Sequence, residues 1–77
     1  MSLIRFLDGL EESGLKDFSK KQLFAIYIKK TGSSSTGTFD RLLQHMQAMD
    51  LLKKNKEKKI WLLDKKETEN FKKQVNQ

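Results

Sequence analysis

Cysteine and proline are absent from this 77-residue sequence, and histidine occurs once, at position 45. The lack of cysteine excludes disulfides, thiolate metal ligands and a cysteine nucleophile. His45 has no second histidine with which to complete a metal site, so we expect an ordinary surface or phosphate-facing histidine and no cofactor. A chain without cysteine also fits a reducing compartment.

Long apolar runs are missing too, and the ones present are too short to cross a bilayer. Charged side chains interrupt the first twelve residues at Arg5, Asp8, Glu11 and Glu12. That segment therefore lacks the uncharged core and the cleavage site of a signal peptide. Together these absences predict a cytoplasmic protein that does not span a membrane.

Acidic residues are in the minority, since ten Asp and Glu face sixteen Lys and Arg, which leaves a formal charge of +6. The length allows one domain, spanning residues 1–77. A chain of this size buries only about 60 to 65% of its unfolded surface, so a single core needs nearly all of its apolar residues. The positive charge predicts an anionic partner, with nucleic acid as the first candidate and an anionic membrane surface as the second.

Hydrophobic periodicity predicts two helices in the first half of the chain. Apolar residues recur on one helical face over residues 3–12. Ser19 and Gln22 match a capping box, which starts a second helix. This helix should run over residues 20–30 and end before Gly32.

A third helix follows a short turn rich in serine and glycine. Ser35 is the expected N-cap, with the helix beginning at Thr36. Leu43, Met46 and Met49 share one apolar arc and should lie in the core, which leaves a polar outer face.

The last third of the chain predicts a hairpin and a final helix. Two short extended segments, residues 51–54 and 59–63, suit a two-stranded hairpin with a four-residue connection. Asp64 and Glu67 repeat the capping pattern before a weakly apolar segment. Residues 64–77 would therefore form a C-terminal helix near 65–75 or a tail.

Positive charge concentrates in two segments that flank the third helix. Residues 19–34 carry four lysines and no acid, and residues 51–63 carry five lysines and one glutamate, whereas residues 35–50 have a net charge of −1. Lysines crowded on a hairpin repel one another unless a polyanion neutralises them. The distribution favours nucleic acid and no membrane partner, because the lysines lie on a hairpin instead of along the polar face of an amphipathic helix. The alternative is that these lysines only keep the hairpin edge soluble and unpaired.

The order of three helices followed at once by a basic hairpin resembles the winged helix-turn-helix family of DNA-binding domains. Residues 38–52, TFDRLLQHMQAMDLL, resemble the family's recognition helix running into its first wing strand. Asp50 stands where the family usually has glycine, and aspartate tolerates the left-handed conformation better than most residues. The resemblance covers roughly residues 3–63. It implies an α+β winged helix-turn-helix of three helices, a two-stranded β-hairpin wing and a C-terminal helix.

The family's docking mode implies that the third helix lies in the major groove while the second crosses the backbone. Arg41 would contact guanine and Gln44 adenine, and Asp40 would accept from a cytosine amine or orient Arg41. The serines and threonines before the helix and the lysines of the second helix would contact phosphate. The hairpin lysines would contact phosphate or enter the adjacent minor groove. The candidate DNA-binding residues are Lys20, Lys21, Ser34, Ser35, Thr36, Gly37, Thr38, Asp40, Arg41, Gln44, His45, Lys53, Lys54, Lys56, Lys58 and Lys59.

The resemblance implies a sequence-specific double-stranded DNA-binding protein, a compact transcriptional regulator of the kind encoded by plasmids and viruses of bacteria and archaea. A homodimer could form through the first helix or through the face that carries Phe71 and Val75. Two alternatives stay open. The first is a nonspecific architectural or replication-associated DNA binder. The second is a protein-interaction winged helix whose basic wing meets an acidic partner.

An enzyme is not expected. Gly32 and Gly37 have the spacing of a phosphate-binding P-loop, but Thr38 and Phe39 stand where that loop needs its lysine and its magnesium-binding hydroxyl. The sequence also has no zinc-binding histidine motif and no nucleophile elbow.

Overall fold

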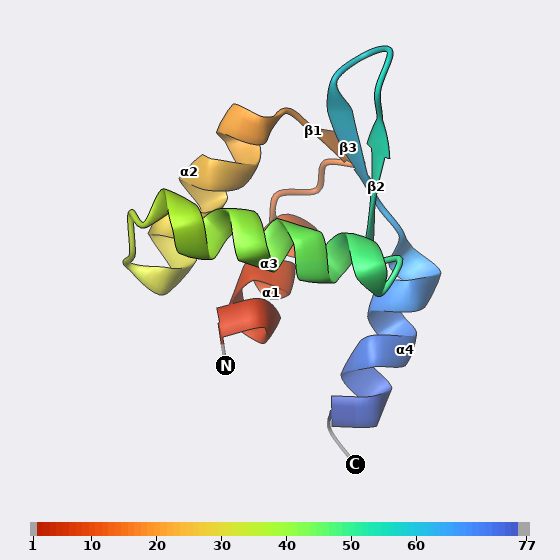
Figure 1. The fold of residues 1–77 in the computed structure, drawn as a ribbon. Helices are drawn as coiled ribbons and strands as arrows, with labels where there is room; N and C mark the ends of the chain where they lie inside the picture. The colour runs from red at the N-terminus through yellow and green to blue at the C-terminus, as the bar shows by residue number, and fades with distance from the viewer. Residues whose placement is uncertain (1, 76–77) are drawn as a thin grey trace.

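The computed structural model describes residues 2–75, which form four helices and one three-stranded antiparallel sheet (Figure 1). The α+β class and the four predicted helices are confirmed. Within this range no helix is long and apolar enough to cross a membrane. In chain order the elements are α1 (Ser2–Glu12), β1 (Asp17–Phe18), α2 (Lys20–Thr31), α3 (Thr36–Ala48), β2 (Leu52–Asn55), β3 (Ile60–Leu63) and α4 (Lys65–Val75).

The predicted hairpin of two strands is confirmed by β2 and β3, and β1 adds a third strand that was not predicted, in the order β1-β3-β2. Asp17 pairs opposite Leu62 and Phe18 opposite Trp61. β3 has two edges, and β1 satisfies the backbone groups of the edge that β2 leaves free. A strand of two residues is too short to show an alternating pattern, so the sequence carries no signal for it.

The hairpin also begins one residue later than predicted, with its turn at residues 56–59. The Asn55 side-chain oxygen accepts hydrogen bonds from the backbone N–H groups of Glu57 (3.1 Å) and Lys58 (3.2 Å). Lys59 closes the turn in the left-handed region, at φ 54°. The asparagine side chain therefore fixes where the strand ends.

Three of the predicted local signals are confirmed at the helix ends. Ser19 and Gln22 form both bonds of the capping box, and Ser35 caps α3 by accepting from the backbone N–H of Thr38. Asp50 takes the left-handed conformation, at φ 60°. The chain therefore turns after α3 without glycine.

The core lies between α1, α2, α3 and the inner face of the sheet. Four aromatic rings meet there, and Phe39 touches each of the other three, which are Phe6, Phe24 and Tyr27. Met49 does not join the core as predicted and is 37% exposed, since α3 ends at Ala48 and Met49 is its C-cap. The buried apolar residues are Phe6, Leu7, Leu10, Phe18, Leu23, Tyr27, Phe39, Leu43, Met46, Leu51, Leu52 and Trp61.

Two glycines inside helices provide a matched test of packing. A Cβ at Gly9 would lie 2.7 Å from Lys30 Cγ and 2.8 Å from Ile26 Cγ2 on α2, whereas a Cβ at Gly37 would meet nothing within 4 Å. Alanine improves helix propensity by about 1 kcal/mol at either position, but at Gly9 the overpacking cost of about 1 to 3 kcal/mol exceeds this gain. We expect Gly9→Ala to lower the free energy of unfolding in urea and Gly37→Ala to raise it. Equal stabilisation by both would contradict the close α1–α2 approach.

α4 packs onto the end of the core through few side chains. Thr68 is buried and Phe71 packs partly against the core. Lys72 forms ion pairs with Asp8 (2.6 Å) and Glu11 on α1. Hydrogen bonds from its ammonium to these two carboxylates raise the pKa of Lys72 above the ordinary lysine value. Ion pairs thus add to a small apolar contact in holding the last helix.

Asp64 caps the start of α4 and provides a pH-dependent test. Its carboxylate accepts from the backbone N–H of Glu67 (3.0 Å), and this bond, with Lys53 nearby, lowers the pKa of Asp64. A lowered pKa contributes stability that is present above the ordinary value and is lost as the pH falls through the folded value. Asp64→Asn keeps a capping side chain without the charge. Urea unfolding should show the wild type as the more stable at pH 6, with the difference in unfolding free energy shrinking as the pH falls below the ordinary aspartate pKa and then through the lowered pKa of Asp64. A difference in unfolding free energy that does not change with pH would contradict the lowered pKa of Asp64.

Candidate nucleic-acid interface

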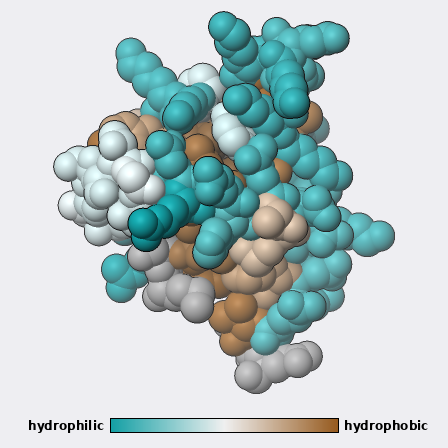
Figure 2. Space-filling view, in the orientation of Figure 1, coloured by the Kyte–Doolittle hydropathy of each residue, from teal (hydrophilic) through white to brown (hydrophobic). Residues whose placement is uncertain are grey.

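The outer face of α3 is polar and accessible. Arg41, Gln44 and His45 are all exposed, as are Gly37 and Asp40 nearer its start. α3 crosses the front of Figure 1, and Figure 2 shows hydrophilic side chains gathered over it and around the hairpin. The structure therefore brings the predicted base-reading residues together on one exposed surface.

The turn before α3 holds its hydroxyl groups in local bonds. The Ser35 hydroxyl contacts that of Thr38 (3.1 Å), and the Ser33 hydroxyl accepts from the backbone N–H of Ser35 (3.3 Å). Ser34 and Thr36 are exposed beside them. Thr38 is thus part of the helix cap, and Ser34 and Thr36 are the residues of this turn placed to contact an incoming phosphate.

Lys20, in the first turn of α2, lies between the first half of α3 and the hairpin. Its ammonium is 3.5 Å from the Asp40 carboxylate on α3. Among the described residues, the ion pair of Asp40 is therefore with Lys20, and the expected contact with Arg41 is not formed. Lys20 also borders a concave surface that we call the hairpin hollow. It is lined by Lys20, Lys54, Lys56, Lys59 and Trp61.

The hairpin divides its lysines between two faces. Lys54 lies opposite Trp61 and holds its ammonium 5.5 Å from the centre of the Trp61 ring, a cation–π contact. Lys53 lies opposite Leu62, on the other face, with its ammonium 3.4 Å from the Asp64 carboxylate. Successive side chains of a strand point to opposite faces. Lys53 is therefore separated from the other candidates.

A second concave surface near α3, which we call the aromatic hollow, was not predicted from the sequence. It measures about 330 Å³ and lies between the first turns of α2 and α3. The capping box at Ser19 places the start of α2, but only packing of the two helices shows that their first turns enclose a space. Its lining residues are Lys20, Lys21, Phe24, Thr36, Phe39 and Asp40.

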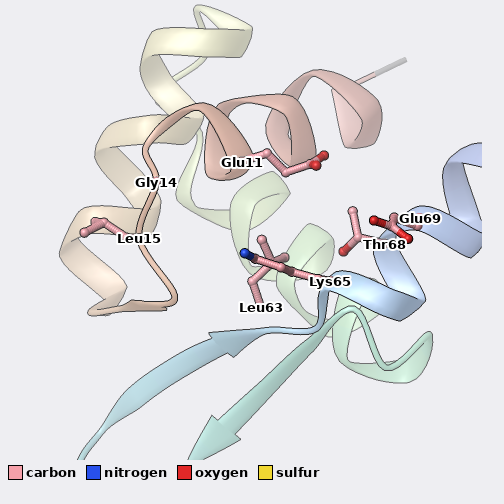
Figure 3. Close-up of a pocket in the computed structure, with 7 residues that line it drawn as sticks. All are labelled: Glu11, Gly14, Leu15, Leu63, Lys65, Thr68 and Glu69. Carbon is pink, nitrogen blue, oxygen red and sulfur yellow. The ribbon is translucent and has the colours of Figure 1, made fainter.

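A further hollow, of about 280 Å³, lies between the end of α1 and the start of α4 (Figure 3). Two of its polar groups already have partners, since Glu11 pairs with Lys72 and the buried Thr68 hydroxyl donates to the Asp64 carbonyl oxygen (2.7 Å). None of the predicted DNA-binding residues lines it. It is therefore not part of the candidate interface.

The chain was compared with known protein families, curated proteins and solved structures, and none of them matches it.

Proposed function

We propose that this chain is a winged helix-turn-helix protein that binds double-stranded DNA sequence-specifically and acts as a small transcriptional regulator. The proposal rests on the placement of charge around α3. The polar outer face of α3 lies beside positive charge from two other elements, and Lys20 touches both the α3 side and the hairpin side. The arrangement of four helices and a three-stranded antiparallel sheet is compatible with that fold.

The reading element in this proposal is α3. It would enter the major groove, where Arg41 can form a bidentate contact to guanine and Gln44 one to adenine. Gly37 has open space around it and lets the helix approach closely. Because α3 contributes little positive charge of its own, its side chains suit base edges better than phosphates.

The anchoring element is the basic surface beside α3. Lys20, Lys21, Lys54, Lys56 and Lys59 border the two hollows on this side of the molecule. Lys53 is left out, since it lies on the other face of the hairpin. With about five phosphate contacts, the slope of log affinity against log salt concentration should be near −4.5.

Selection from a pool of random duplexes tests the proposal. The protein should enrich a defined site, and fluorescence anisotropy should then give tighter binding to that site than to a scrambled duplex across a salt series. Enrichment of no site, with binding that is equal on every duplex, would show a nonspecific binder. Failure to bind any duplex at low salt would overturn DNA binding and favour an acidic protein partner.

A further inference from the structure

We infer that the aromatic hollow binds one unstacked nucleotide whose base carries an exocyclic amino group, and that it prefers cytosine to thymine. The inference rests on the proposed function, because it takes nucleic acid as the ligand. It adds a second recognition site beside the outer face of α3, for a base that has left the helical stack.

The floor of the hollow is aromatic. Phe24 is half-buried, and its ring centre lies 4.9 Å from that of the buried Phe39 beneath it. Bases released from a duplex stack on such rings, and each stacked base contributes substantially to affinity. The hollow, of about 330 Å³, is shallow and open to solvent, so a base can stack in it while its other face stays exposed.

The rim carries the groups that a nucleotide needs. Lys20 and Lys21 supply ammonium groups for the phosphate, and Thr36 adds a hydroxyl. Asp40 is an acceptor only, so it can receive a hydrogen bond from the amino group of cytosine but repels the O4 oxygen of thymine. The combination of an aromatic floor, two ammonium groups and one carboxylate matches an amino-bearing nucleotide better than a purely apolar ligand.

An ion pair bridges part of this rim in the free protein. The Lys20 and Asp40 side chains are 64% and 52% exposed, and exposed pairs are weak. A nucleotide would replace that pair with two contacts, from Lys20 to its phosphate and from Asp40 to its base. Breaking the Lys20–Asp40 ion pair therefore costs little free energy, and each of the two side chains gains a new partner on the nucleotide.

The hairpin hollow can hold the phosphates next to the bound nucleotide. Lys20 lines the hairpin hollow as well as the aromatic hollow. A strand whose backbone follows Lys54, Lys56 and Lys59 therefore passes Lys20 and can place one base over Phe24. The two hollows share Lys20 and thus form one basic surface, in which Phe24 lies in the aromatic hollow and Trp61 in the hairpin hollow under Lys54.

The test uses three fluorescent duplexes of one sequence, namely an intact duplex, one with a single unpaired cytosine and one with a single unpaired thymine. We expect anisotropy titrations to give about tenfold tighter binding to the cytosine bulge than to the intact duplex. The thymine bulge should bind about fivefold more weakly than the cytosine bulge. The two bases differ at position 4, where cytosine has an amino group and thymine an oxygen, at N3, which carries a hydrogen only in thymine, and in one methyl group.

Two variants separate the floor from the rim. Phe24→Leu keeps an apolar side chain but removes the flat ring, so it should abolish the gain on both bulges while binding to the intact duplex stays unchanged. Asp40→Asn should equalise the two bulges, because an amide can accept from cytosine and donate to thymine. Glu69→Gln, an equal change of charge on exposed α4, is the control and should keep the preference for cytosine. Urea unfolding confirms that each variant is folded.

The outcomes distinguish this inference from the proposed function. Equal affinity of the wild type for all three duplexes overturns the nucleotide site and leaves duplex binding intact. Preference for the thymine bulge, or a cytosine preference that survives Asp40→Asn, overturns the role of Asp40. Failure to bind the intact duplex, together with a cytosine preference between the bulges, overturns the proposed function and supports the site. Failure to bind any of the three overturns both.

Discussion

Replacing Arg41 with alanine should weaken binding to the selected duplex about 10- to 100-fold and leave binding to a scrambled duplex nearly unchanged. Arg41 is exposed at the centre of the α3 outer face, and its two parallel donors fit the acceptor pair of guanine. Loss of a base contact reduces the difference between duplexes, whereas loss of a phosphate contact weakens all of them together. Anisotropy titrations on both duplexes measure the effect.

The chain supplies a matched control for this change. Arg5 is the other arginine; it is exposed on α1 and lines neither the aromatic hollow nor the hairpin hollow. Arg5→Ala removes the same charge and should change neither affinity nor specificity by more than about twofold. If Arg41→Ala weakens every duplex equally, Arg41 contacts phosphate and its base-reading role is wrong.

Replacing Lys54, Lys56 and Lys59 together with glutamine should weaken binding to every duplex by roughly 100-fold at moderate salt. Each lysine that no longer neutralises a phosphate removes about 0.9 from the salt slope, so the slope should become shallower by about 2.7. The ratio between selected and scrambled duplexes should stay the same. A salt series on both duplexes tests both expectations.

A second triple variant controls for net charge. Lys65, Lys66 and Lys73 are exposed on α4 and belong to neither basic hollow. Replacing these three with glutamine removes the same charge and should change the salt slope by less than about 0.5. Equal loss of affinity in the two triple variants would mean that DNA binding depends on overall charge, and the hairpin would then not be the anchoring surface.

Local chemistry accounts for the parts of the fold that could be predicted. Ser19 and Ser35 start their helices by accepting backbone hydrogen bonds a few residues ahead. Such bonds depend on neighbours in the chain, so a short stretch of sequence is sufficient to place them. The same holds for Asp50, whose left-handed backbone follows from the turn that it must make. The hairpin turn was missed by one residue because Asn55 stays in the strand, opposite Ile60, while its side chain accepts hydrogen bonds from the turn that follows.

The candidate site was predictable in its composition and less so in its arrangement. The exposed face of α3 follows from helical periodicity, which separates Arg41 and Gln44 from the core. The count of lysines in the hairpin segment does not say which face of the hairpin each lysine occupies. Lys53 and Lys54 are neighbours in sequence, yet one pairs with Asp64 and the other lies over Trp61.

By itself, the sequence determined the four helices, their caps and the two lysine-rich segments, because each depends on residues within one or two turns of chain. Only the tertiary structure decided the third strand, the pairing of Lys20 with Asp40 and the aromatic hollow between α2 and α3. These features join segments far apart in the chain, and their geometry depends on how the helices and the sheet pack around one core. The tertiary structure therefore gathers several of the surplus lysines on one surface around Lys20.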